Sequence, residues 1–389
     1  MTTPARSPVA LAFGGLLALA AAMGIGRFVY TPILPFMSEG LGLPADDAGL
    51  IASANFLGYL AGALLGASRF LPGSPRFWFL SGLAVSALTS CAMAATTALP
   101  AFLLIRFISG IASAFVLVFS TSLILERLAS SGRAGLSALH FAGVGCGIAF
   151  SALLVAALAH LSADWRLLWL ASGGVTLFFF LLAAWLVPAD NTRKAGSAEA
   201  GFQPAASPFS SGSRVRLILA YGLFGFGYVI TATFVNAIAR ATPALQPTEP
   251  FVWLTVGLCA APSIYIWNRI AGRLGTRQAF AMACVLEAGG VALTAVTLQP
   301  VLFLLGAGLL GGTFMGITAL GLMEARREAS DGGAAAIRRM LAVLTASFGL
   351  GQMAGPWFAG QLHHATGSFS AASLAAAASL MVAAALVAR

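Results

Sequence analysis

Charged residues are scarce in this chain: only 8% of its 389 residues are Asp, Glu, Lys or Arg, against roughly 25% in a soluble domain. Hydrophobic residues make up 59%, and the mean hydropathy is +0.92. No His-Glu-x-x-His motif, no Gly-x-x-x-x-Gly-Lys-Ser/Thr loop and no nucleophile with a plausible base occurs in the sequence. We therefore expect neither a soluble protein nor an enzyme, and no cofactor.

Cysteine is also rare, and its four positions carry no metal-binding pattern. Cys91, Cys146, Cys259 and Cys284 all fall within apolar stretches, without the spacing of metal ligands. We interpret them as small core residues, not as disulfides or metal ligands.

Long apolar runs dominate what remains. We count twelve, each near the ~20 residues that cross a hydrocarbon core ~30 Å thick. The predicted membrane segments are 9–36, 48–68, 77–97, 100–125, 134–160, 165–187, 216–239, 251–268, 278–298, 300–323, 340–361 and 369–388.

The positive charges follow every second connection between these segments. Of 21 cations, 17 lie on one side: Arg6, Arg69, Arg76, Arg127, Arg133, Arg193, Lys194, Arg214, Arg216, Arg269, Arg273, Arg277, Arg326, Arg327, Arg338, Arg339 and Arg389. Only Arg166 and Arg240 lie on the other side, which predicts an inner-membrane protein with both termini in the cytoplasm. This distribution also explains the net charge of +9 through orientation and contact with anionic lipid, not through nucleic-acid binding.

One long connection divides the segments six and six. It covers about 188–213 and is rich in Pro, Ser, Gly and Ala, which is typical of a flexible linker. We predict an all-α membrane protein with an N-terminal six-helix half at 1–190, a cytoplasmic linker at 191–213 and a C-terminal six-helix half at 214–389.

The two halves repeat one another at an offset near 200 residues. Matched features are Gly-Ile-Gly at 24–26 with Gly-Phe-Gly at 225–227, Arg69 with Arg269, and Pro100 with Pro300. Parallel repeats are a known plan of membrane transporters.

Three short motifs carry a family resemblance. Residues 24–35 read Gly-Ile-Gly-Arg-Phe-Val-Tyr-Thr-Pro-Ile-Leu-Pro, 106–110 read Arg-Phe-Ile-Ser-Gly, and 165–166 read Trp-Arg. They resemble the first-helix signature of the YbfB/YjiJ-type branch of the major facilitator superfamily, that superfamily's fourth-helix Arg-x-x-Gln-Gly motif and the opening of its sixth helix. The resemblance covers essentially the whole chain. It implies two pseudo-symmetric six-helix halves and secondary transport by alternating access, with helices one, four, seven and ten around a central cavity.

The connection after the eighth segment departs from this family. Residues 273–277 keep Arg-Leu-Gly-Thr-Arg, but Gly272 stands where the family has an acidic residue, and 66–76 in the first half lacks the Asp as well. The resemblance therefore does not support an aspartate-based gate latch in these connections.

Small residues at four-residue spacing mark close helix contacts in lipid. Such ladders comprise Gly58, Gly62 and Gly66; Gly143 and Gly147; Gly308, Gly312 and Gly316; and Ser347, Gly351 and Gly355. They fit either static packing or a sliding contact between moving parts.

Two arginines lie inside apolar segments, where an ionised side chain costs about 2.5–3.5 kcal/mol and normally faces a cavity or a partner. Arg27 lies eight residues inside the end of its helix near Pro35, and Arg106 six residues inside the start of its helix at Pro100. At ~1.5 Å per residue, both sit roughly 9–12 Å below the periplasmic face. A pair of guanidinium groups at one depth suits a carboxylate, sulfonate or phosphate.

Four neutral residues complete the predicted substrate site. Asn55 and Tyr30 share the level of the arginines, Gln352 lies about twelve residues deep in its helix, and Tyr228 stands 201 residues after Arg27 in the repeat. Each also has a structural alternative: the arginines could tie helices to backbone carbonyls, and the polar side chains could bond between helices.

Glu287 and His140 are the other ionisable residues deep in the segments. A carboxyl group in an apolar setting and an imidazole can each carry a proton, so we predict that any proton coupling uses one of them. Structural hydrogen bonding is the alternative for both.

These observations predict a monomeric, proton-linked transporter of a small organic anion, with substrate, protons and membrane lipid as its partners. The 28 Phe residues favour, as an alternative, efflux of amphipathic or toxic compounds. A non-transporting membrane receptor or scaffold is the third interpretation.

Overall fold

The computed structural model describes residues 7–68, 71–188 and 212–388, and these residues form helices and no strands. Twelve stretches of them are long and apolar enough to cross a membrane, which confirms the predicted number. In chain order the helices are α1 (Pro8–Leu19), the π-helix η1 (Ala20–Ile25) and α2 (Tyr30–Leu41), which form the first span; α3 (Ala45–Gly66); α4 (Pro75–Met93); α5 (Leu99–Ser120), the π-helix η2 (Thr121–Leu125) and α6 (Glu126–Ser130), which form the fourth; α7 (Ser137–His160); α8 (Trp165–Leu186); α9 (Gly212–Ala241); α10 (Glu249–Leu274); α11 (Thr276–Val296); α12 (Pro300–Glu328); α13 (Gly333–Thr366); and α14 (Ser370–Ala388).

Several helices run past the predicted segments. The span predicted at 340–361 belongs to α13, which covers Gly333–Thr366, and α12 continues to Glu328. The extra turns carry Arg326, Arg327, Arg338 and Arg339. Hydropathy finds only the part of a helix that lies in hydrocarbon, so charged helical turns outside it are missed.

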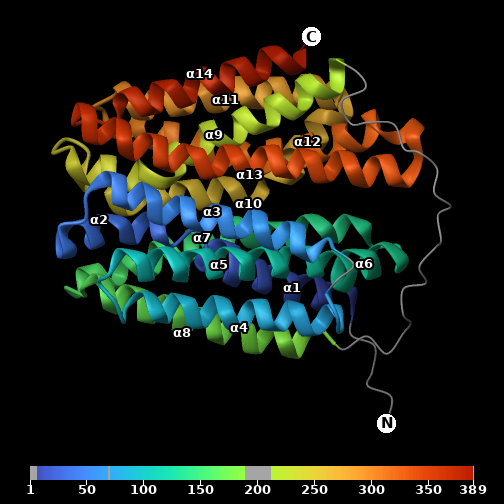
Figure 1. Cartoon of the computed structure of the whole chain (residues 1–389), viewed down its shortest axis with the longest axis horizontal. Helices are drawn as coiled ribbons and strands as arrows, with labels where there is room; N and C mark the ends of the chain where they lie inside the picture. Colours follow the sequence, from blue (N-terminus) through green and yellow to red (C-terminus); the bar gives the residue numbers. More distant parts are fainter. Residues whose placement is uncertain (1–6, 69–70, 189–211, 389) are drawn as a thin grey trace.

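The helices form two six-span halves that lie side by side, one from α1 to α8 and one from α9 to α14 (Figure 1). The beginning of α1 and the end of α14 lie at the same end of the bundle, here named the termini end, at the right of Figure 1. We name the opposite end the far end. Of the linker predicted at 191–213, Gly212 and Ser213 begin α9 and the rest lies outside the described residues, as do Arg6, Arg69, Arg193, Lys194 and Arg389.

The glycine ladders pack within the halves. A Cβ atom on Gly58 would lie 1.9 Å from the Phe107 carbonyl oxygen of α5, and one on Gly351 would lie 2.1 Å from the Gly222 carbonyl oxygen of α9. In each case the partner helix belongs to the same half. These ladders therefore hold each half together, which is the static alternative.

The contacts between the halves run along α3 with α13, α7 with α10, and α2 with α9. Thr31 Oγ1 donates to the Ala232 carbonyl (2.7 Å), and Arg240 pairs with Glu39 (2.5 Å). Both pairs are separated by 201 residues, the offset of the sequence repeat. The first span and α9 thus meet along the pseudo-symmetry axis.

Polar contacts close the far end between the halves. Arg240 of α9 donates to both carboxylate oxygens of Glu39 (2.5 and 2.8 Å) and lies 3.8 Å from Glu249 of α10. Beside this ion pair lies a cavity of about 360 Å³, the far-end cavity, whose lining includes Pro32, Phe36, Ala156, Asn236, Glu249 and Trp253.

At the termini end, Arg277 joins α11 to α12. Its guanidinium lies 3.1 Å from Glu324 and 3.0 Å from Glu328. The acidic partner that Gly272 cannot provide in the connection is supplied by the last turns of α12.

Candidate functional site

The first span is irregular just where Arg27 lies. In the π-helix η1, Gly26 N–H donates to the Ala21 carbonyl (2.8 Å) and Phe28 N–H to the Met23 carbonyl (3.2 Å), each five residues back. Thr31 N–H then donates to the Phe28 carbonyl (3.2 Å), one residue short of the usual helical partner, Arg27. The slip leaves backbone carbonyls that need donors from elsewhere.

Arg106 of α5 supplies those donors. Its two terminal nitrogens donate to the Gly26 (3.1 Å) and Arg27 (2.9 Å) carbonyls, and Ser109 Oγ donates to the Gly26 carbonyl (3.2 Å). The Arg106 side chain is only 3% exposed. In this structure its guanidinium therefore stabilises the broken helix, and the predicted contact with substrate stays a prediction.

Tyr30 and Asn55 belong to the same interhelical network. The Tyr30 hydroxyl donates to the Ala48 carbonyl (2.9 Å), and Asn55 Nδ2 donates to the Arg106 carbonyl (3.0 Å). Both side chains are buried and engage backbone. They tie the first span, α3 and α5 together around Arg27.

Arg27 points the other way, toward the second half. Its Nη2 donates to Gln352 Oε1 of α13 (3.1 Å), and Gln352 Nε2 donates to the Tyr228 hydroxyl of α9. The structure thus brings together Arg27, Gln352 and Tyr228, three of the six predicted substrate residues, across the interface between the halves. Among the described residues Arg27 has no acidic partner.

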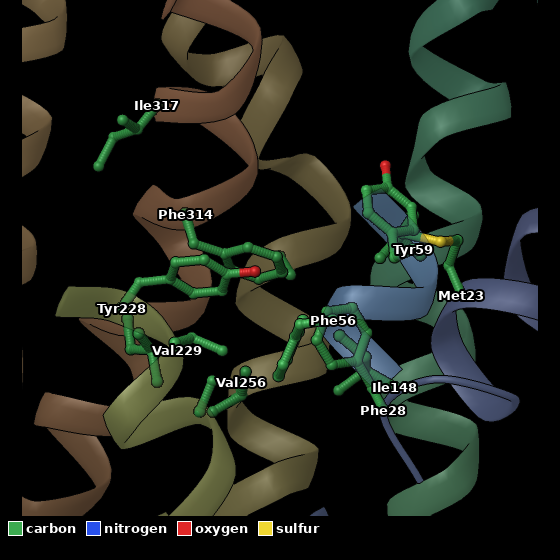
Figure 2. Close-up of a cluster of buried hydrophobic side chains, with 14 of the residues drawn as sticks. Met23, Phe28, Phe56, Tyr59, Ile148, Tyr228, Val229, Val256, Phe314 and Ile317 are labelled. Carbon is green, nitrogen blue, oxygen red and sulfur yellow. The ribbon is translucent and has the colours of Figure 1, made fainter. Parts of the chain in front are cut away.

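Aromatic rings enclose this trio. The Arg27 Cζ atom lies 4.0 Å from the Tyr59 ring centroid and 4.7 Å from that of Phe56. On the other side, Tyr228 stacks on Phe314 with centroids 5.6 Å apart and planes within 6°. Figure 2 shows Tyr228 and Phe314 facing Phe56 and Tyr59.

Sequence reasoning singled out Tyr228 but missed the other rings, and for Tyr59 and Phe348 a helical signal was available. Tyr59 follows Asn55 by four residues and Phe348 precedes Gln352 by four, so each shares a helix face with a residue singled out for polarity. Phe348 stacks on Tyr228, with centroids 5.9 Å apart and planes within 4°.

The two predicted proton carriers bond to neither Arg27, Gln352 nor Tyr228, and they belong to different halves. Glu287 is fully buried on α11 and accepts from Thr313 Oγ1 (3.2 Å), while its other oxygen has no partner. His140 is fully buried on α7, where its Nε2 lies 3.3 Å from Ser120 Oγ. The described residues contain no group of three or more His, Cys, Asp or Glu side chains that could bind a metal.

Comparison with known proteins identifies the family. The family described as "Uncharacterised MFS-type transporter YbfB" matches residues 19–388. An MFS-type transporter of Bacillus subtilis (strain 168), YceJ, is 25% identical over 299 residues, which are 74% of this chain and 73% of that protein.

Solved structures share the fold. The nucleoside transporter NupG has a TM-score of 0.74 at 17% identity, with 98% of each chain covered. A bacterial homologue of the human lysosomal transporter Spinster, in an inward-facing and occupied conformation, has a TM-score of 0.71 at 14% identity. The match covers 100% of this chain and 95% of the Spinster homologue. The matching proteins are transporters and not enzymes. The chain belongs to the YbfB-type family of the major facilitator superfamily and is a multi-pass membrane transporter, with twelve spans among the residues that the structure describes.

Proposed function

We propose that this transporter moves a small organic anion, a carboxylate, sulfonate or phosphate, across the inner membrane by secondary active transport. One observation carries the proposal: a buried guanidinium of the first half, without an acidic partner in the described chain, faces two polar groups of the second half. An unpaired buried charge is costly. A substrate anion would provide the missing negative charge at the point where both halves meet.

The six predicted substrate residues take two roles in this proposal. Arg27, Gln352 and Tyr228 bind the substrate, because their polar groups meet between the halves. Arg106, Asn55 and Tyr30 are positioning residues, because they bond to the backbone around Arg27. Substrate binding would therefore pull on both halves at once, which is what alternating access requires.

The arrangement of contacts supports an inward-facing conformation. Ion pairs and backbone contacts join the halves at the far end, and the bias of arginines places the termini end in the cytoplasm. One fold neighbour is described as inward-facing and occupied. In our proposal the chain works as a monomer, and substrate reaches the buried Arg27 from the cytoplasmic end.

Coupling to protons is the second part of the proposal. Thr313, which bonds Glu287, is adjacent in sequence to Phe314, which stacks on Tyr228. This chain of contacts would let the protonation state of Glu287 affect the substrate site through α12. His140 has no such chain to Arg27 among the contacts described above, so Glu287 is the better candidate.

Flux measurements test the proposal. Purified protein in proteoliposomes should transport at least one member of a panel of radiolabelled carboxylates, sulfonates and phosphates, and Arg27→Gln should abolish that flux. Arg27→Lys should restore little, because an ammonium cannot reproduce the bidentate grip. Arg166→Gln, which removes an exposed cation at the far end, is the matched control. Equal anion flux in Arg27→Gln and wild type would refute the proposal.

Efflux of amphipathic compounds is the second candidate, and one cavity favours it. A cavity of about 660 Å³ between α3, α5 and α13 has an almost entirely apolar lining that includes Leu57, Phe107 and Trp357. Drug-like cations in the same flux panel separate this function from anion transport.

A further inference from the structure

One buried edge of the Arg27 guanidinium offers two hydrogen-bond donors, of which only one has a partner. Nη2 donates to the amide oxygen of Gln352 (3.1 Å), whereas the neighbouring Nε has no partner. A carboxylate binds such an edge with two parallel hydrogen bonds, one to each nitrogen. Gln352 supplies one oxygen where a carboxylate would supply two.

Tyr228 adds a third polar contact on the same side. Its hydroxyl accepts from Gln352 Nε2, so its own O–H is available as a donor. A carboxylate that displaces the Gln352 oxygen from Arg27 would come within the group of donors formed by Arg27, Gln352 and Tyr228. All three side chains are 3% exposed or less, so water competes little for these bonds.

Aromatic rings lie on both sides of the polar trio. Phe28, Phe56 and Tyr59 lie with ring centroids 5.3, 4.7 and 4.0 Å from the Arg27 Cζ atom. Across the interface, Phe314 and Phe348 are nearly parallel to Tyr228. Phe28 also meets Phe314 edge-on, with centroids 6.3 Å apart, so a ring contact joins the two sets. Figure 2 shows these rings together with aliphatic side chains such as Val229 and Val256.

From this geometry we propose that the preferred substrate is an aromatic carboxylate, whose carboxylate binds Arg27 and whose ring packs among Phe28, Phe56, Tyr59, Phe314 and Phe348. The inference rests on the proposed function, because it specifies the anion that the same site takes. Rings pack on rings with a stabilisation beyond the buried area. A saturated ring of equal size lacks that contribution.

Matched probes test the inference in wild-type protein. Benzoate and cyclohexanecarboxylate carry the same charge and similar size, and benzamide is the neutral counterpart of benzoate. In calorimetric titrations of the purified transporter, we expect benzoate to bind roughly two- to tenfold more tightly than cyclohexanecarboxylate, and benzamide to bind much more weakly.

A pair of variants locates the effect. Phe314→Leu should bring the ratio of benzoate to cyclohexanecarboxylate affinity close to one. Phe234→Leu is the control, because Phe234 is also buried and stacks on Phe369, with ring centroids 4.5 Å apart, away from Arg27. The wild-type comparison stands even if a variant fails to fold.

The outcomes separate the failure of the aromatic preference from the failure of anion transport itself. If cyclohexanecarboxylate binds as tightly as benzoate, or more tightly, the aromatic inference is wrong while anion transport stands. If both carboxylates fail to bind but other anions are transported, the inference is again wrong alone. If benzamide binds as well as benzoate, or no anion binds or moves, the proposed function is wrong and the inference falls with it.

Discussion

A methyl group added at Gly49 should open the far end of the transporter. Gly49 of α3 faces α13 across the interface between the halves, and a Cβ atom there would lie 2.3 Å from the Pro356 carbonyl oxygen. Ordinary contact begins at 3.4 Å, so the Cβ atom would be about 1.1 Å too close (3.4 minus 2.3 Å). Such overpacking costs typically 1–3 kcal/mol. The cost falls only on conformations in which α3 and α13 touch, so the far-end-open population should rise by about 5- to 150-fold.

The rate of cysteine labelling at the far end measures this population. In a background without the four native cysteines, Ala156→Cys places a thiol in the far-end cavity, and a membrane-impermeant maleimide reports how often that end opens. Gly49→Ala should accelerate labelling by the factor given above. Gly58→Ala is the control for overpacking within one half, and Gly174→Ala, whose Cβ meets nothing within 4 Å, is the control for substitution alone. Unchanged labelling in folded Gly49→Ala protein, or equal acceleration in Gly58→Ala, would refute the reasoning.

Two further predictions concern the interior. Arg106→Ala should lower the melting temperature by several degrees, because it leaves the Gly26 and Arg27 carbonyls without their guanidinium donor. An unsatisfied buried group costs about 1–3 kcal/mol. A melting temperature equal to wild type would show that Arg106 does not stabilise the broken helix. Combining Glu287→Gln with His140→Asn should uncouple substrate flux from an imposed pH gradient while substrate exchange continues, and pH-driven accumulation at the wild-type level would show that protons travel elsewhere.

Topology could be predicted because it follows from composition. Twelve spans and two halves need only the length of apolar runs and the count of arginines between them, and both come from one-dimensional patterns. The repeat offset also recurs in two contacts between the halves: Thr31 with Ala232 and Glu39 with Arg240 are both 201 residues apart.

The partners of individual helices could not be predicted in the same way. Four-residue spacing identifies one face of a helix and not the helix that packs against it. The ladders at Gly58 and Gly351 pack within their halves. Gly49 and Gly360 stand outside the ladders, and a Cβ atom added at these positions would lie 2.3 and 2.6 Å from a backbone carbonyl oxygen of the opposite half. The four-residue pattern therefore marks contacts within each half, and the contacts of Gly49 and Gly360 with the opposite half lie outside that pattern.

Depth alone also could not tell the two buried arginines apart. Both were expected at one level below the periplasmic face, and Arg106 does reach the Arg27 carbonyl. What separates their roles is a one-residue slip of helical hydrogen bonding in η1, which has no reliable pattern in the sequence. The slip turns two carbonyls toward Arg106, and Arg27 projects to the other half.

The second half lacks the broken helix, and this difference supports the separate roles of Arg106 and Arg27. Its counterpart of the first span, α9, is one uninterrupted helix from Gly212 to Ala241, so it leaves no carbonyls in need of an outside donor. The repeat that matches Pro100 with Pro300 places Gly306 opposite Arg106, and a Cβ at Gly306 would meet the Gly290 carbonyl oxygen at 2.6 Å. A glycine thus packs tightly where the first half has a guanidinium. Arg106 thus stands in the half whose first helix is broken, as expected of a residue that stabilises the break. The repeat gives Arg27 a different kind of counterpart, Tyr228, and both Arg27 and Tyr228 bond to Gln352.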